Sequence, residues 1–175
     1  MLASLTVRDV VLIDRLALEL AAGLAVLTGE TGAGKSILLD ALGLALGARA
    51  EARLVRQGAE QASVAAVFEL PPDHPAHALL AEQGIEDEGA LTLRRILAPD
   101  GKSRAFVNDQ PVSVGLLRQL GDLLVEVQGQ FESRGLLDAA THRGLLDAFG
   151  GLEREAERLA ADWNATFKKY NRTQQ

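Results

Sequence analysis

The sequence contains no cysteine, and this absence excludes two kinds of site. Disulfide bonds and thiolate metal centres both need cysteine, so neither is expected. Only three histidines occur, His74, His77 and His142, and they are too few and too scattered to predict a zinc site. A reducing, cytoplasmic setting is therefore the expected one. Stability must come from an apolar core, which 47% hydrophobic residues in a chain of 175 can supply.

Long apolar runs and an excess of positive charge are also missing. No run is long enough to span a bilayer and the N-terminus lacks the apolar stretch of a signal peptide, so we expect no membrane partner. The net charge is −6 and the pI is about 5.1. A domain that holds nucleic acid by phosphate neutralisation alone is usually basic. Any DNA contact must therefore be local, or made by parts of the protein outside these residues.

A complete phosphate-binding motif is present near the N-terminus. It matches G-x-x-x-x-G-K-[ST] at every fixed position, through Gly29, Glu30, Thr31, Gly32, Ala33, Gly34, Lys35 and Ser36. The glycines let backbone N–H groups point at phosphate oxygens, and the start of a following helix adds partial positive charge. The motif predicts ATP as ligand, with Lys35 reaching the β- and γ-phosphates and the Ser36 hydroxyl binding Mg²⁺.

The segments around this motif predict an α/β fold with a P-loop. Leu24–Thr28 is a short apolar run, typical of a strand buried on both faces. A helix is predicted over Lys35–Leu46, ending at Gly47. Further strands are predicted over 5–9, 14–20, 62–70, 91–97 and 104–107, with turns at 99–101 and 108–109, and these suggest an antiparallel subdomain. Further helices are predicted over 76–82, 112–120, 133–138 and 141–149.

The acid that P-loop ATPases use to hold Mg²⁺ is not found. No four apolar residues precede an Asp-Glu pair; the nearest segment is a predicted strand over Leu123–Val127, which contains Glu126. Glu126 is more often an ordinary strand residue than a metal ligand in such a position. Gln128 and Gln130 follow, and either could reach Mg²⁺ or the attacking water. The alternative is a plain polar turn.

Two other patterns leave alternatives open. Arg94, Arg95, Lys102 and Arg104 lie on the predicted hairpin and form either a basic patch or an ordinary solvated face. A heptad pattern closes the chain, through Leu152, Ala156, Leu159, Trp163, Thr166 and Tyr170. It is either one amphipathic helix packed on its own domain or, as we favour, the beginning of a longer coiled coil.

Together, these motifs resemble the N-terminal half of an SMC-type ATPase head, the class of SMC proteins and Rad50. Within that class, segments 27–37, 101–108 and 145–150 are similar to the RecN family of bacterial DNA repair proteins. The resemblance implies residues 1–150 as half of an ABC-type head and 151–175 as the start of a coiled coil. It implies a C-terminal half with the signature motif and catalytic acids, a second head in a homodimer, and DNA bound by the complete assembly.

The resemblance also implies roles for single residues. Gln128 takes the position of the Q-loop glutamine, with a catalytic and Mg²⁺-binding role, and Gln130 competes for it. Arg49 and Arg53 are candidates for the arginine that acts near the γ-phosphate. The implied function is double-strand break repair and recombination at the bacterial nucleoid. The rivals are an SMC-like head for chromosome organisation, a small P-loop metabolite kinase and a structural dimerisation module.

Overall fold

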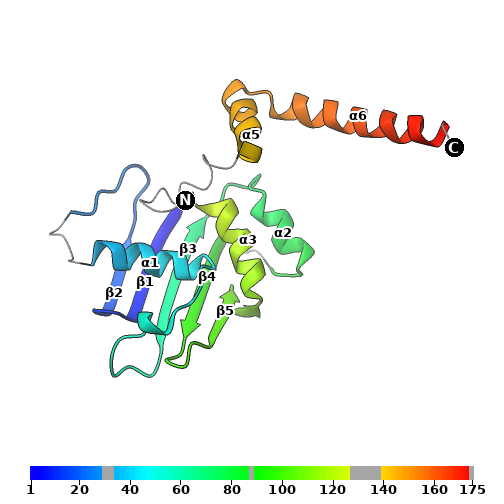
Figure 1. Cartoon of the computed structure of the whole chain (residues 1–175). Helices are drawn as coiled ribbons and strands as arrows, with labels where there is room; N and C mark the ends of the chain where they lie inside the picture. The colour runs from blue at the N-terminus through cyan, green and yellow to red at the C-terminus, as the bar shows by residue number, and fades with distance from the viewer. Residues whose placement is uncertain (29–33, 87–88, 127–138, 174–175) are drawn as a thin grey trace. The chain divides into compact units, whose positions relative to one another are not determined.

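The computed structural model describes residues 1–28, 34–86, 89–126 and 139–173 (Figure 1). The chain divides into two compact units, Met1–Glu126 and Val127–Gln175, and each is described by itself. The domain boundary at residue 150, inferred from the sequence, stays a prediction.

The first unit is built on a six-stranded sheet in which every neighbouring pair is antiparallel. The order is β2-β1-β3-β4-β5-β6, with β1 Leu2–Val10, β2 Ile13–Glu19, β3 Ala62–Glu69, β4 Ala90–Leu97, β5 Ser103–Val107 and β6 Gln110–Val112. The five strands of the predicted subdomain are confirmed. The sixth, β6, was not predicted because three residues are too few to show an alternating pattern.

Helices cover one face of this sheet. In β3 and β4, buried residues alternate with half-buried ones, so each strand has an inner and an outer face. The inner face packs under α1 (Lys35–Ala45) and α3 (Val114–Leu124), and α2 (Ala76–Glu82) packs beside α3 (Figure 1). The core includes Val64, Phe68, Leu91, Leu93, Leu44, Leu117 and Leu120. These side chains form the apolar core that the hydrophobic content of the sequence led us to expect.

The two covering helices touch through glycines. A Cβ atom on Gly121 of α3 would lie 2.6 Å from the backbone oxygen of Leu46, which follows α1. Gly47 ends α1 with a φ of +89°, and a Cβ there would lie 2.7 Å from the amide nitrogen of Arg118. Only glycine permits this approach of two backbones. Gly47 thus stops the helix where the sequence predicted.

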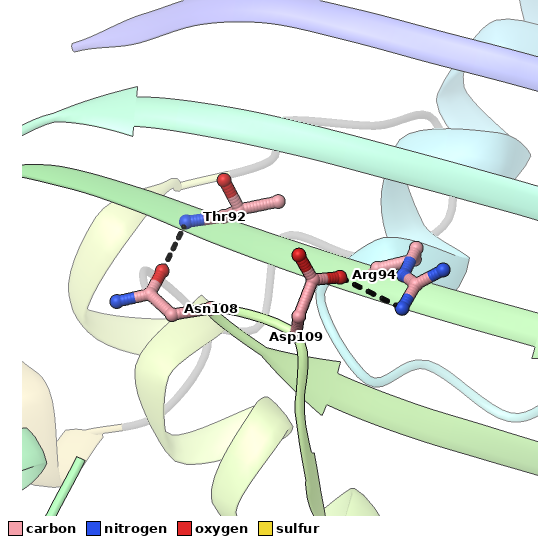
Figure 2. A network of polar contacts seen from close by, with 4 residues as sticks. All are labelled: Thr92, Arg94, Asn108 and Asp109. Carbon is pink, nitrogen blue, oxygen red and sulfur yellow. Dashed lines mark hydrogen bonds and ion pairs between the residues drawn. The ribbon is translucent and has the colours of Figure 1, made fainter. Parts of the chain in front are cut away.

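A tight turn joins β5 to β6. Asn108 and Asp109 have φ values of 46° and 62°, which is the pattern of the type I′ hairpin turn. The Asn108 side-chain oxygen accepts a hydrogen bond of 2.9 Å from the Thr92 amide nitrogen, as Figure 2 shows. The turn predicted from Asn108-Asp109 is confirmed.

Two predicted strands are wrong. Leu24–Thr28 forms no strand and its apolar side chains lie exposed, with Leu24 at 93%. Leu123 and Leu124 belong to the last turn of α3, and Val125 and Glu126 form no strand. A strand buried on both faces needs hydrogen-bonded neighbours, and no described strand provides them.

The second unit consists of helices in its described part. α5 spans Ala139–Gly150, which confirms the helix predicted over 141–149, and α6 spans Glu153–Thr173. The helix predicted over 133–138 lies outside the described residues. On α6 the heptad residues Leu159, Trp163 and Tyr170 are exposed, by 56%, 68% and 59%. In the described ranges, no helix combines the length and apolarity that crossing a membrane requires.

Candidate nucleotide-binding site

The start of α1 is shaped by a glycine. Gly34 precedes the helix with φ 92° and ψ −3°, a left-handed conformation that favours glycine. Its carbonyl accepts the first helical hydrogen bond, from the Leu38 amide nitrogen at 3.0 Å. No side chain caps this end of the helix. The backbone geometry therefore favours the glycine that the motif has at this position.

The electrostatics of this helix end favour an anion. The first turn of an α-helix presents backbone N–H groups and the positive end of the helix dipole. The first turn of α1 contains no acidic residue that would compete for them. Lys35 is half-buried and Ser36 is exposed at the same end. Lys35, Ser36 and the first amides of α1 thus lie at the same helix end, which suits a bound phosphate.

Part of the predicted site lies outside the described residues. Gly29, Glu30, Thr31, Gly32 and Ala33 are in this group, as are Gln128 and Gln130. Of the predicted nucleotide-binding residues, the structure brings together Gly34, Lys35 and Ser36.

The loop after α1 carries the two arginines proposed to act near the γ-phosphate. Arg49 and Arg53 are both exposed, and Arg53 lies in a short 3₁₀ helix over Ala52–Leu54. The Arg53 Nε donates a hydrogen bond to a carboxylate oxygen of Glu51. This bond lowers the pKa of Glu51 and raises the pKa of Arg53. Sequence reasoning missed Glu51, although it lies only two positions before Arg53.

Only some of the predicted Mg²⁺ ligands lie among the described residues. Ser36 is described, and Glu126, the weak acidic candidate, is exposed just beyond Val125. Within the described ranges no group of three or more His, Asp or Glu residues could hold a metal ion. Ser36 nevertheless fits the part expected of it, because its hydroxyl lies next to Lys35 at the anion-favouring end of α1.

The four basic residues of the hairpin do not form one patch. Consecutive residues of a strand point to opposite faces, so Arg94 and Arg95 separate. Arg95 is buried on the inner face, where its Nη2 donates to the Ser103 hydroxyl at 2.8 Å and burial lowers its pKa. Arg94 lies on the outer face, 2.8 Å from a carboxylate oxygen of Asp109 (Figure 2). A patch that includes Arg95 is therefore wrong.

Comparison with known proteins identifies the class of this fold. A family described as an AAA domain matches residues 4–87. A solved structure concerned with ATP-driven dimerisation and DNA-stimulated activation of SMC ATPases superposes with a TM-score of 0.60 and 20% identity. It covers 83% of this chain and 97% of that one. The Smc head domain with a coiled coil and joint from Pyrococcus yayanosii gives a TM-score of 0.63 at 21% identity, over 97% of this chain and 36% of that one. By fold, the chain is similar to SMC head domains.

The sequence comparison is more specific. The DNA repair protein RecN of Halalkalibacterium halodurans is 41% identical over 171 residues, which is 97% of this chain. The chain is thus RecN-like in sequence, and the resemblance predicted from its motifs is confirmed. It spans about 30% of the length of the curated relatives it matches.

Proposed function

We propose that this chain is the ATP-binding part of an SMC-like ATPase that acts in DNA double-strand break repair and recombination. The observation that carries the proposal is the junction of motif and helix. A complete phosphate-binding sequence leads into Gly34, Lys35 and Ser36 at the uncapped start of α1. Its similarity to RecN supports the repair context.

Each site residue then has a distinct task. Lys35 places its ammonium against the β- and γ-phosphate oxygens, and the amides of the loop and of α1 hold the phosphates in register. Ser36, with Gln128 or Gln130, would hold Mg²⁺, which neutralises phosphate charge when bound. Arg53, once released from Glu51, would approach the γ-phosphate.

The chain alone lacks half of the groups that catalysis requires. Its sequence contains no signature motif and no Asp-Glu pair preceded by four apolar residues. We infer that a C-terminal half of the same head supplies them and that Leu24–Thr28 pairs with its strands. Two such heads would then close on ATP as a homodimer and act on DNA at the bacterial nucleoid. The isolated chain should bind ATP weakly and hydrolyse it at background rate.

ATP binding by this chain tests the first step. Isothermal calorimetry with ATP and Mg²⁺ should give weak binding that Lys35→Ala abolishes, because the substitution removes the cation facing the phosphates. Ser36→Ala should retain residual binding and lose most of its dependence on Mg²⁺. Lys169→Ala is the matched control, since it removes an exposed lysine from α6 and should bind as the wild type does.

The result that would refute the assignment is equal ATP affinity for the wild type and Lys35→Ala. Equal losses in Lys35→Ala and Lys169→Ala would also refute it, since they would reflect net charge rather than a site.

A further inference from the structure

The outer face of the sheet carries a row of arginines that crosses five strands. The strand register places Arg15 opposite Arg8, Arg8 opposite Ser63, Ser63 opposite Ile96, and Ile96 opposite Arg104. We call these five positions the arginine row. Its three arginines are all exposed. This alignment is invisible in the sequence, because the arginines are separated by up to 96 positions, from residue 8 to residue 104.

Arg8 and Arg15 face each other directly across β1 and β2. Residues in such a pair have Cβ atoms about 5 Å apart, and like charges there destabilise a sheet. The nearest acids in the sequence do not relieve the repulsion, since Asp9 and Asp14 both form ion pairs with Arg56, at 3.7 and 3.0 Å. Within the described ranges, no carboxylate forms an ion pair with Arg8 or Arg15. A bound anion would turn this repulsion into attraction.

The other end of the row has a second basic cluster. Arg104 and Lys102 line a hollow of about 470 Å³, together with Gln61, Ile96, Ala98 and Ser103. Lys102 pairs with Asp100, which is exposed, so this pair is open to exchange for another anion. Next to Arg104 on the same face, the Arg94 guanidinium lies 4.5 Å from the centre of the Phe106 ring. Figure 2 shows Arg94 held in place by Asp109.

Between the two clusters, Ser63 and the half-buried Ile96 occupy the row. The neighbouring outer-face positions are occupied by small side chains, those of Thr6, Ala17, Ser63 and Ala65. Three strand spacings separate β1 from β5, which is about 14 Å at ~4.8 Å per strand. The major groove of B-DNA is about 12 Å wide, so its two bordering strands are separated by a similar distance. Duplex DNA, with phosphates on both sides of its major groove, therefore matches the outer face of the sheet in charge and in spacing.

We propose that the arginine row binds the phosphate backbone of duplex DNA. Arg8 and Arg15 meet one strand, and Arg104 with Lys102 meets the other. This inference rests on the proposed function and specifies the surface that touches DNA. It also explains how a chain with a net charge of −6 can hold a polyanion, because the contact needs only the local positive charge of these side chains. Contacts of this kind carry no sequence information, so binding should not depend on base sequence.

The test is fluorescence anisotropy of this chain with a labelled duplex at several salt concentrations. Arg8→Gln combined with Arg15→Gln should weaken binding at least about tenfold and lower the slope of log affinity against log salt by about two. Arg104→Gln should lower the slope by about one. Arg118→Gln, a matched loss of an exposed arginine on α3, should leave both affinity and slope unchanged.

Stability separates a binding role from a structural one. Because the double variant removes a like-charge pair, its thermal unfolding midpoint should be equal to or higher than that of the wild type. Unchanged duplex affinity and salt slope in this variant would overturn the proposal. So would an equal effect of Arg118→Gln, or competition by polyglutamate as strong as by unlabelled duplex, which would indicate an acidic protein partner.

ATP binding measured on the same samples distinguishes this inference from the proposed function. The double variant should bind ATP as the wild type does, because its substitutions lie on the sheet face opposite α1. If the wild type fails to bind ATP while DNA binding still depends on the arginine row, the proposed function fails and the DNA surface stands. If ATP binding holds and the arginine dependence is absent, the DNA surface fails.

Discussion

Strand β3 and segment Leu24–Thr28 are similar in composition and opposite in outcome. Both are rich in small and branched apolar residues. In β3, Ala62, Val64 and Ala66 are completely buried, while in the other segment Leu24 is 93% and Leu27 is 53% exposed. The difference cannot come from hydrophobicity, which is equal or greater in the exposed segment.

Hydrogen-bonding neighbours explain the difference. β3 lies between β1 and β4, and all three belong to one antiparallel sheet within the chain. A strand next to a P-loop is buried on both faces and needs parallel neighbours, which come from more distant parts of a sequence. The antiparallel sheet is therefore formed entirely by strands of this chain. We propose that the strands next to segment Leu24–Thr28 belong to the C-terminal half of the head.

The largest effect that we predict follows from adding the proposed C-terminal half. Segment Leu24–Thr28 should then become buried as β3 is, and ATP hydrolysis should begin. The chain alone should show background ATP hydrolysis, and the mixture should gain several orders of magnitude in rate, as is typical when groups that stabilise the transition state are restored. Segment 24–28 should become protected from hydrogen exchange in the mixture. A steady-state ATPase assay and exchange mass spectrometry measure the two changes.

The control for this assay is the Lys35→Ala chain with the same complement, which should remain at background. Robust ATP turnover by the wild-type chain alone, lost in Lys35→Ala, would contradict the proposal that the catalytic groups are divided between two halves of the head. It would favour an ATPase or kinase whose catalytic groups all lie in this chain.

A Leu→Ala substitution made in the sheet and in segment Leu24–Thr28 should show how differently the two regions are packed. Leu93→Ala removes a fully buried side chain from β4 and should lower the free energy of unfolding by about 2–5 kcal/mol. Leu24→Ala removes the same atoms from an exposed position and should change it by less than about 0.5 kcal/mol. Urea unfolding followed by circular dichroism measures both values. Similar losses would show that segment 24–28 is packed in solution.

A smaller effect on the free energy of unfolding is expected where α1 and α3 touch, within the first unit. Gly121→Ala would place a Cβ atom 2.6 Å from the Leu46 oxygen and should cost about 1–3 kcal/mol of unfolding free energy. Gly115→Ala on the same helix meets only the Ser113 hydroxyl, at 3.7 Å, and should be neutral or stabilise by up to about 1 kcal/mol. Chemical denaturation of both variants distinguishes them, and a stable Gly121→Ala would contradict the close backbone contact.

The smallest free energy that we predict is that of local unfolding of α6. Its apolar seam is exposed, and in proteins most of the stability of a helix comes from packing of its apolar face. Amides of α6 should therefore exchange nearly as fast as in an unfolded chain, whereas those of β4 should be strongly protected. Hydrogen exchange in a sample shown to be monomeric measures this. Strong protection of α6 in that sample would favour the helix packed on its own domain over the coiled coil.

Local patterns predicted most of the first unit. Local sequence patterns predicted strands β1 to β5, and the Asn108-Asp109 pair predicted a turn, which the structure shows to have type I′ geometry. The motif predicted the start of α1 at Lys35. The strand at 123–127 was mispredicted because a short apolar run fits either a strand or the end of a helix.

The sequence by itself determined the phosphate-binding motif, in which glycine, lysine and serine stand at fixed spacing. It also determined the hydrophobic faces of the strands, because side chains alternate along any strand. Only the tertiary structure decided that Arg95 is buried while Arg94 is not, and that Arg15, Arg8 and Arg104 share one row. The physical reason is register: residues far apart in the chain become neighbours only when strands pair, and pairing is settled by the whole sheet.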